Sequence, residues 1–389
     1  MNKSNKQRNI STLVGGICAL SLAMGFSRFG FTPIIPLMQR DLGISELDIA
    51  VLASANYVGY LIGAYISGKQ RIKDNLLVWL GVGMVVSIIT MVAISLTVNE
   101  GVWIVLRLLS GFLSAILFVV TSNITLGQGR RDWAGYLYSG VGIGIALTGI
   151  FVPIFDSIGG WKASWQGLAI GGSLFGIVAW YTLSQAVRSE TGEPGEIRNT
   201  NNFVRDYRWY VLLISYGLEG IGYIITATFI VQMIKGMHEL SHIANPSWIL
   251  IGLAAVPSTF LWAHIAKMTN IKKSLILAFA VQALGIILTV IIPNKGSILI
   301  GGVLFGGTFM GITSLTITLA SQMKPENQMQ AIGELTTVYA LGQIIGPIVA
   351  AYLQKNFNIV APSFFAVAVL IVALFALMAL RVEDIKLKD

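Results

Sequence analysis

Charged residues are scarce in this sequence. Lys, Arg, Asp and Glu together make up 11% of the 389 residues, whereas a soluble globular domain carries about 25%. Hydrophobic residues reach 55%, and the mean hydropathy is +0.75. So little charge cannot cover a surface that faces water, which excludes a soluble globular protein. The composition therefore predicts an integral membrane protein.

Cysteine is also rare. The single cysteine, Cys18, excludes an internal disulfide framework, and its apolar surroundings predict a packing role. The net charge of +8 is spread over short loops without a basic tract, so we do not expect nucleic acid as a partner. The first apolar run is longer than the ~7–15 residues of a signal-peptide core and lacks a small-residue cleavage site. We expect it to remain in the protein as the first helix.

Long apolar runs dominate the rest of the chain. A membrane-spanning helix needs about 20 mostly apolar residues, and none of these runs shows the alternation of a membrane strand. We therefore predict an all-α integral membrane protein with twelve transmembrane helices. Their expected ranges are 11–36, 47–68, 76–98, 101–126, 133–156, 163–187, 209–235, 247–267, 273–293, 297–321, 328–354 and 358–381.

Lys and Arg mark one side of the predicted membrane. Most of them fall in the N-terminal segment and in every second loop after it, and few fall in the loops between. Because short loops rich in Lys and Arg stay on the cytosolic side, this pattern predicts that both termini are cytosolic. We expect a multi-pass protein of the cytoplasmic (inner) membrane.

One polar interval divides the sequence into two halves. Residues 188–208 contain the segment SETGEPGE and show no apolar periodicity, which is typical of a linker. We expect an N-terminal six-helix bundle at 1–187, a cytosolic linker at 188–208 and a C-terminal six-helix bundle at 209–389.

The two halves share glycine spacings, which indicates an internal repeat. Corresponding glycines lie at offsets of 198 and 192: Gly135 and Gly144 with Gly333 and Gly342, and Gly25 with Gly217. Internal repeats of membrane helices with a site at their interface are typical of transporters. We expect the small residues of the 133–156 and 328–354 helices to form seams of close helix packing.

Five helix segments carry recognisable motifs: residues 25–36 (GFSRFGFTPIIP), 53–63 (ASANYVGYLIG), 107–111 (RLLSG), 216–223 (YGLEGIGY) and 341–347 (LGQIIGP). Together these segments resemble the major facilitator superfamily and, within it, the YbfB/YjiJ-like branch. The resemblance implies two six-helix bundles related by a pseudo-two-fold axis, with one central site exposed alternately to each side. The loop after the second helix departs from the family pattern, because residues 63–71 (GAYISGKQR) lack the expected Asp.

Two charged residues deep in predicted helices are the main candidates for a functional site. A charge in hydrocarbon costs roughly 2.5–3.5 kcal/mol, so such residues usually face a protein interior or a wet cavity. The resemblance places the helices of Arg28 and Glu219 across the central cavity. We expect these residues to pair or to bind a shared solute, with a purely structural ion pair as the alternative. Because burial can raise the pKa of a carboxylic acid, we hypothesise that Glu219 carries the coupling proton.

Two further charges lie nearer the ends of predicted helices. By resemblance, Arg107 would tune a proton-accepting group, although its side chain could instead extend toward the interface. Glu334 begins the 328–354 helix, where a contact with the helix dipole is as plausible as a role in proton coupling.

Polar and aromatic residues at helical spacing predict three faces of a cavity. These are Asn56 and Tyr60 on one helix, Tyr216, Glu219 and Tyr223 on a second, and Thr336, Tyr339 and Gln343 on a third. Each face taken alone could equally be helix packing. Together with the arginines they suit a small amphipathic or anionic solute, whose aromatic part would stack on the tyrosines.

One motif points to a different class of protein. His238, Glu239 and His242 fit the His-Glu-x-x-His pattern of zinc proteases. The segment falls in the loop after the 209–235 helix, however, and no acidic third ligand follows nearby. We therefore predict no metal site, no cofactor and no enzymatic activity, with a membrane metalloprotease as a remote alternative.

The sequence as a whole predicts a monomeric secondary transporter that moves a small organic solute by alternating access and draws on the proton gradient. Export is favoured, because the glycines of the 133–156 helix resemble an antiporter pattern. Import or facilitated passage of a small metabolite, lipid translocation and a transporter-like receptor remain alternatives. Lipid translocation would require an apolar cavity open to the bilayer.

Overall fold

The structure is a computed structural model. It describes residues 3–67, 72, 74–127, 133–188, 205–325 and 327–380, and within these ranges the chain is built from helices joined by short turns. Part of the loop after the second predicted helix and residues 189–204 of the predicted linker lie outside the described residues.

The helices follow the apolar runs of the sequence. The first half of the chain forms α1 (Lys3–Leu20), the π-helix η1 (Ser21–Phe29), α2 (Phe31–Leu42), α3 (Glu46–Ser67), α5 (Leu76–Ser95), α6 (Glu100–Leu126) and α7 (Ala134–Arg188). The second half forms α8 (Tyr207–Gly236), the 3-10 helix η3 (His238–Ile243), α9 (Ala244–Met268), α10 (Ile271–Ile291), α11 (Lys295–Met323), α12 (Gln328–Asn356) and α13 (Ala361–Ala379).

Polar residues between the apolar runs define several helix starts. Asn99, Asp206, Asn270 and Asn294 each precede a helix and accept a hydrogen bond from the backbone N–H three residues later. Such side chains satisfy donors that have no partner within the helix, so they fix where it begins.

Eleven helices in the described part are long and apolar enough to span a membrane, whereas the sequence predicted twelve. The difference is α7, which joins the expected 133–156 and 163–187 spans into one element of 55 residues. A straight helix of that length would measure about 80 Å, far more than the ~30 Å hydrocarbon core. The backbone instead breaks at Gly159 and Gly160, where a φ of +65° at Gly160 requires glycine. α7 therefore consists of two helices joined at this break.

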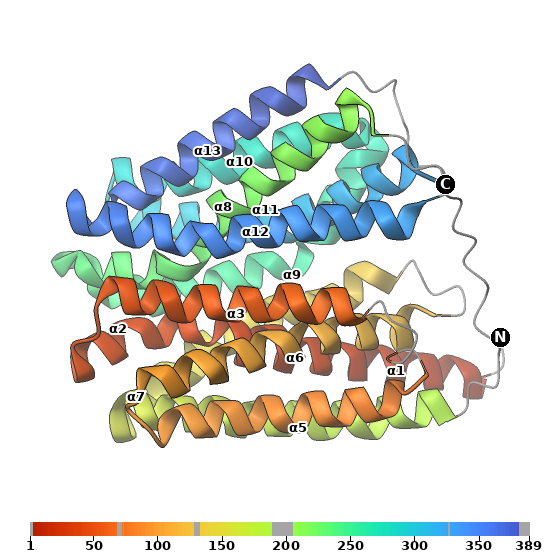
Figure 1. The fold of residues 1–389 in the computed structure, drawn as a ribbon, viewed down its shortest axis with the longest axis horizontal. Coiled ribbons are helices and arrows are strands. Elements are labelled where there is room, and N and C mark those ends of the chain that lie inside the picture. The colour runs from red at the N-terminus through yellow and green to blue at the C-terminus, as the bar shows by residue number, and fades with distance from the viewer. Residues whose placement is uncertain are drawn as a thin grey trace.

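The helices form two layers (Figure 1). The elements from α1 to α7 pack mainly against one another, and so do those from α8 to α13. Contacts between the layers run from α7 to α9, from α3 to α12 and from α2 to α8. α1 begins and α13 ends at the same end of the molecule, on the right in Figure 1. We call this end the terminal face and the other end the opposite face.

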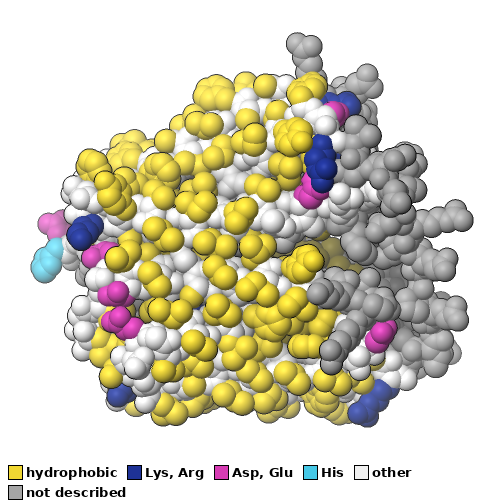
Figure 2. Space-filling model, viewed as in Figure 1, with side chains coloured by type: hydrophobic (Ala, Val, Ile, Leu, Met, Phe, Trp, Pro, Cys, Tyr) yellow, Lys and Arg dark blue, Asp and Glu magenta, His cyan; other side chains and the backbone are white. Residues whose placement is uncertain are grey.

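The molecular surface is apolar between these two faces. In the view of Figure 2, hydrophobic side chains cover the middle of the molecule, and the Lys, Arg, Asp and Glu side chains gather at its left and right ends. An apolar belt between two charged ends is the surface that a bilayer requires.

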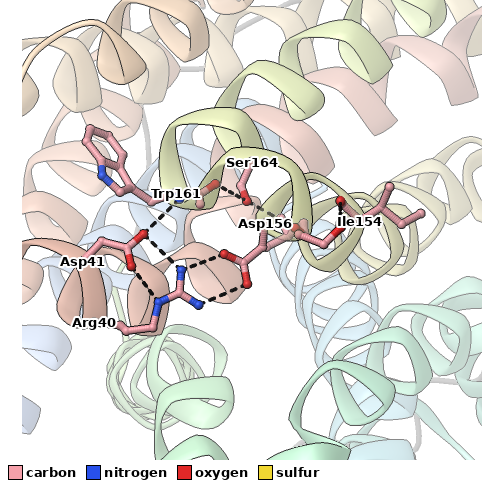
Figure 3. A network of polar contacts seen from close by, with 9 residues as sticks. Arg40, Asp41, Ile154, Asp156, Trp161 and Ser164 are labelled. Carbon is pink, nitrogen blue, oxygen red and sulfur yellow. Dashed lines mark hydrogen bonds and ion pairs between the residues drawn. The ribbon is translucent and has the colours of Figure 1, made fainter.

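A cluster of charged side chains ties the end of α2 to the break in α7 (Figure 3). The Arg40 guanidinium bonds to Asp41 and to Asp156, with shortest distances of 2.6 and 2.7 Å. Asp41 Oδ2 also accepts the backbone N–H of Trp161 at 3.2 Å. Because these contacts all lie within the first layer, they hold the far end of the first span to that layer.

Glycines bring helices into backbone contact at corresponding places in both layers. A Cβ on Gly144 of α7 would lie 2.7 Å from the Gly25 Cα and from the Ser21 carbonyl oxygen of η1. In the second layer, a Cβ on Gly342 of α12 would collide with the Gly217 carbonyl oxygen of α8. The glycine pairs expected from the sequence repeat therefore make equivalent contacts, and both helices are packing seams as predicted.

Replacing Gly144 with Ala should destabilise the protein, because the new Cβ would displace backbone atoms rather than a flexible side chain. Overpacking of this kind typically costs about 1–3 kcal/mol. Gly333→Ala is the matched control, since a Cβ there meets no atom within 4 Å and removing a helical glycine stabilises by roughly 0.5–1 kcal/mol. Melting temperatures of the purified variants in detergent should fall for Gly144→Ala and hold or rise for Gly333→Ala. Equal melting temperatures would show that the seam tolerates a methyl group.

Candidate functional site

The two layers meet around Arg28, which η1 buries to 4% exposure. Its Nη2 donates a hydrogen bond of 2.9 Å to Gln343 Oε1 of α12, so this bond crosses between the layers. Its Cζ lies 4.0 Å from the ring centroid of Tyr60 and 5.0 Å from that of Tyr57. A desolvated cation over an aromatic face gains about 2 kcal/mol, which offsets part of the cost of burying the charge.

The helix that carries Arg28 changes type at this point. η1 is a π-helix of nine residues, all buried, between the α-helices α1 and α2 of the same span. A π-helix forms i→i+5 hydrogen bonds, is rare, and occurs frequently at functional sites. Because it turns more slowly per residue than an α-helix, it alters the direction in which Arg28 leaves the helix.

Arg107 of α6 is the second buried cation. Its side chain is 2% exposed, and its Nη1 donates to the Ser27 carbonyl oxygen at 3.3 Å. Its Cζ lies 4.5 Å from the ring centroid of Phe31. Ser27 directly precedes Arg28 in the sequence, so both guanidinium groups border the same turn of η1.

Glu219 of α8 is fully buried. Its Oε1 accepts a hydrogen bond of 3.2 Å from Gln282 Nε2 of α10, while its Oε2 has no hydrogen-bond partner among the described residues. Arg28 bonds to Gln343 instead. The expected ion pair between Arg28 and Glu219 is therefore not formed, and each charge has a neutral amide as its partner.

Tyrosines stand between these two charges. The Tyr339 ring of α12 stacks on Tyr216 with centroids 4.5 Å apart and on Tyr223 with centroids 6.1 Å apart. Tyr223 also stacks on Phe309 of α11 at 5.2 Å. The α8 and α12 faces predicted from helical spacing therefore meet as one aromatic stack, with Glu219 on the same stretch of α8.

Hydroxyl groups join the two layers between the site and the opposite face. Each of these bonds links neutral groups, so the layers can separate there without breaking an ion pair. The bonds run from Thr32 Oγ1 to the Ala227 carbonyl (2.8 Å), from Ser54 Oγ to the Ile344 carbonyl (2.8 Å) and between Tyr57 Oη and Thr228 Oγ1 (3.2 Å).

Three of the predicted site residues make other contacts. The Asn56 amide donates to the Arg107 carbonyl at 3.0 Å and to Ser110 Oγ at 2.8 Å, so it joins α3 to α6 within the first layer. The Thr336 hydroxyl bonds back to its own helix at Ile332. Glu334 lies near the terminal face and is described next.

Glu334 is part of a polar cluster that links α12 to the start of α8. Its carboxylate accepts from the Arg205 guanidinium at 2.6 Å, from Trp209 Nε1 at 2.9 Å and from Gln330 Nε2 at 3.2 Å. The hydrogen bond to Glu334 raises the pKa of Arg205 above its ordinary value. These three hydrogen bonds explain the position of the Glu334 carboxylate, and none of them involves a residue of the central site.

Sequence reasoning missed two residues of the site. Gln282 is a lone polar side chain in the apolar stretch LILAFAVQALGIIL of α10, and such isolation in a membrane helix was a usable signal. Tyr57 adjoins the predicted Asn56, but the direction of its ring depends on how α3 packs, which the sequence does not state.

Comparison with known proteins places the chain in a family. The family described as "Uncharacterised MFS-type transporter YbfB" matches residues 20–378. The chain belongs to this family. Its members are transporters of the major facilitator type, as the helix segments suggested. No curated protein matches the sequence.

Solved structures show the same major facilitator fold at low sequence identity. A mutant of the nucleoside transporter NupG has a TM-score of 0.74 and 15% identity, covering 95% of this chain and 99% of that one. Unmutated NupG has a TM-score of 0.70 and 15% identity, covering 95% and 98%. A bacterial homologue of the human lysosomal transporter Spinster, in an inward-facing conformation, has a TM-score of 0.70 and 13% identity, covering 99% and 100%.

The His-Glu-x-x-His segment of this transporter does not have the geometry of a protease site. His238, Glu239 and His242 are exposed and lie in the 3-10 helix η3. Residues i and i+4 share a face in an α-helix, but with three residues per turn they do not in a 3-10 helix. Among the described residues, no group of three His, Cys, Asp or Glu side chains could hold a metal ion.

Replacing Gln282 with Leu should destabilise the protein by about 1–3 kcal/mol, because it removes the hydrogen bond that Gln282 donates to the buried Glu219 carboxyl. The double variant Glu219→Leu/Gln282→Leu should recover most of that loss, since removing both partners of a buried bond is nearly neutral. The measurement is thermal unfolding in detergent, arranged as a double-mutant cycle. Strictly additive effects would mean that the two side chains do not interact.

Proposed function

We propose that this member of the YbfB-type family is a proton-coupled secondary transporter that exports a small organic solute across the cytoplasmic membrane. One central site, formed by η1, α3, α8 and α12, opens alternately to each side. The terminal face is the cytosolic one, in keeping with the distribution of Lys and Arg. We further propose that the elements before and after the 188–208 linker move as two units.

The observation that carries proton coupling is the setting of Glu219. Among the described residues, the buried charged side chains are Arg28, Arg107 and Glu219, so Glu219 is the buried carboxyl of this set. Its hydrogen-bond donor is the neutral Gln282 amide. A carboxyl group held in this way can gain or lose a proton without breaking an ion pair.

A glutamine partner suits both protonation states of a carboxyl group. Its NH₂ donates to the carboxylate, and after the amide turns over, its carbonyl accepts from the carboxylic acid. Gln282 Oε1 and Glu219 Oε2 are both buried without hydrogen-bond partners in the described part of the chain. A hydrogen bond from a protonated Glu219 to the Gln282 carbonyl could therefore form without breaking another bond of that carbonyl. Gln282 would therefore hold Glu219 in place while its proton comes and goes.

The solute site is polar and aromatic. Arg28, Gln343 and the rings of Tyr60 and Tyr339 lie where the two layers meet, and both tyrosines are only partly buried. A lipid translocator would require an apolar cavity, so these residues favour a small solute over a lipid. Export is inferred from the glycines of α7, which resemble an antiporter pattern. One of these glycines, Gly144, contacts η1.

The test of coupling is Glu219→Gln in proteoliposomes. The assay uses a solute that raises the melting temperature of the purified protein, selected from a panel of nucleosides and of aromatic and aliphatic carboxylates. In the variant, the flux driven by a pH gradient should fall at least tenfold, because glutamine carries no titratable proton. It should retain exchange of labelled for unlabelled solute, which needs alternating access but no proton movement.

Glu239→Gln serves as the matched control. It makes the same chemical change at an exposed position of the 3-10 helix η3 and should leave both fluxes at the unmutated level. Full pH-gradient drive in Glu219→Gln would exclude Glu219 as the proton carrier. Uptake into right-side-out vesicles in place of efflux would reverse the assigned direction.

A further inference from the structure

The first layer contains two buried guanidinium groups around one turn of η1. Arg107 Nη1 bonds to the carbonyl of Ser27, and Arg28 follows Ser27 directly. Both cations are buried, with exposures of 4% for Arg28 and 2% for Arg107. Like charges held together inside a membrane protein cost free energy unless something of opposite charge compensates them.

The protein compensates these cations with neutral groups. Arg28 has the Gln343 amide oxygen and aromatic rings as its partners, and Arg107 has the Ser27 carbonyl oxygen and the Phe31 ring. The Nε atoms of both arginines are buried without a hydrogen-bond partner among the described residues. The buried carboxyl, Glu219, bonds to Gln282 and to neither arginine. Two positive charges and two N–H donors without partners are therefore buried next to η1.

Flat aromatic faces stand beside these donors. Tyr60 lies over the Arg28 guanidinium in the first layer, while Tyr339 carries the stacked Tyr216 and Tyr223 in the second. Tyr60 and Tyr339 are only partly buried, so each residue keeps some accessible surface. An inorganic anion would satisfy the arginines but leave the rings unused, whereas an organic anion with a planar body would use both.

We propose that the solute is a small organic anion with a planar or aromatic body, whose carboxylate binds between Arg28 and Arg107 while the body stacks against Tyr60 and Tyr339. A guanidinium group matches a carboxylate with paired N–H donors, which gives both strength and direction. On binding, the carboxylate replaces Gln343 as the Arg28 partner and so loosens a bond between the layers. This assignment rests on the proposed transport function, since it names the solute class of that site.

The test is ligand binding to the purified full chain in detergent, with sodium benzoate, its neutral counterpart benzamide, adenosine and inorganic phosphate as probes. Benzoate should raise the melting temperature, and benzamide, adenosine and phosphate should not. Arg28→Gln and Arg107→Gln should each weaken benzoate binding at least tenfold, which corresponds to about 1.4 kcal/mol. Arg208→Gln removes an arginine that is half exposed and paired with Asp206, and it should bind benzoate as the unmutated protein does.

The comparison of benzoate with benzamide needs no variant, so it decides the matter even if the arginine variants do not fold. Equal stabilisation by the acid and the amide overturns the proposal, as does unchanged affinity in a folded Arg28→Gln protein. Binding of phosphate alone, or of no carboxylate in the panel at millimolar concentration, also overturns it. Benzoate binding without proton-driven flux refutes the transport function alone. Proton-driven flux of a neutral nucleoside without benzoate binding refutes the anion assignment alone.

Discussion

Charge burial inside a membrane protein is the constraint on which the rest of the structure depends. Arg28 must leave hydrocarbon, and it does so by pointing from η1 to the junction of the two layers, where Gln343 and Tyr60 receive it. Because Gln343 belongs to the other layer, the groups that surround the Arg28 guanidinium depend on the relative position of the two layers. A movement that separates α12 from η1 exposes the guanidinium to whatever fills the gap, either water or an anion. In the proposed cycle, the same residue would respond to both the ligand and the conformation.

Each layer must be rigid if a movement of one layer against the other is to displace the residues of the site. Backbone contacts at Gly25 with Gly144 and at Gly217 with Gly342 lock the site helices η1 and α8 to their neighbours in each layer. The Arg40 cluster fixes the far end of the first span in the same way. Between the layers, hydroxyl groups such as those of Thr32 and Ser54 bond to backbone carbonyls, while Gly142 of α7 and Gly252 of α9 bring a second pair of helices into backbone contact. Neutral hydrogen bonds on the η1 side can break without separating charges, and close helix contact on the α7 side can keep the layers together as they rock.

Hydropathy predicted the helices, and helical spacing predicted the α8 and α12 faces that stack on each other, because both depend on residues close together in the sequence. Neighbouring residues on an α-helix differ by 100° in direction, so the partner of a side chain depends on packing that local patterns do not contain. That is why the sequence did not show that Arg28 and Glu219 bond to Gln343 and Gln282 and not to each other; a solute shared by the two residues stays a prediction. Glu219 bonds to Gln282 of α10, and tyrosines of α8 and α12 stand between the two charges. The π-helix was missed for a related reason, since the apolar composition of residues 21–29 suits an α-helix equally well.

The net charge moved in one proposed cycle is set by the number of protons and anions that cross the membrane. In that cycle Glu219 carries the proton and the two buried arginines bind the anion. One proton entering while one anion leaves transfers two positive charges inward, and the membrane potential contributes about 2.3 kcal/mol per charge per 100 mV. Export of an anion would then draw on the potential as well as the pH gradient, whereas import of the same anion with a proton would be electroneutral and draw on the pH gradient alone. With the proposed exchange of one proton for one anion, export of an anionic solute would therefore have a larger driving force than import in a cell whose interior is negative.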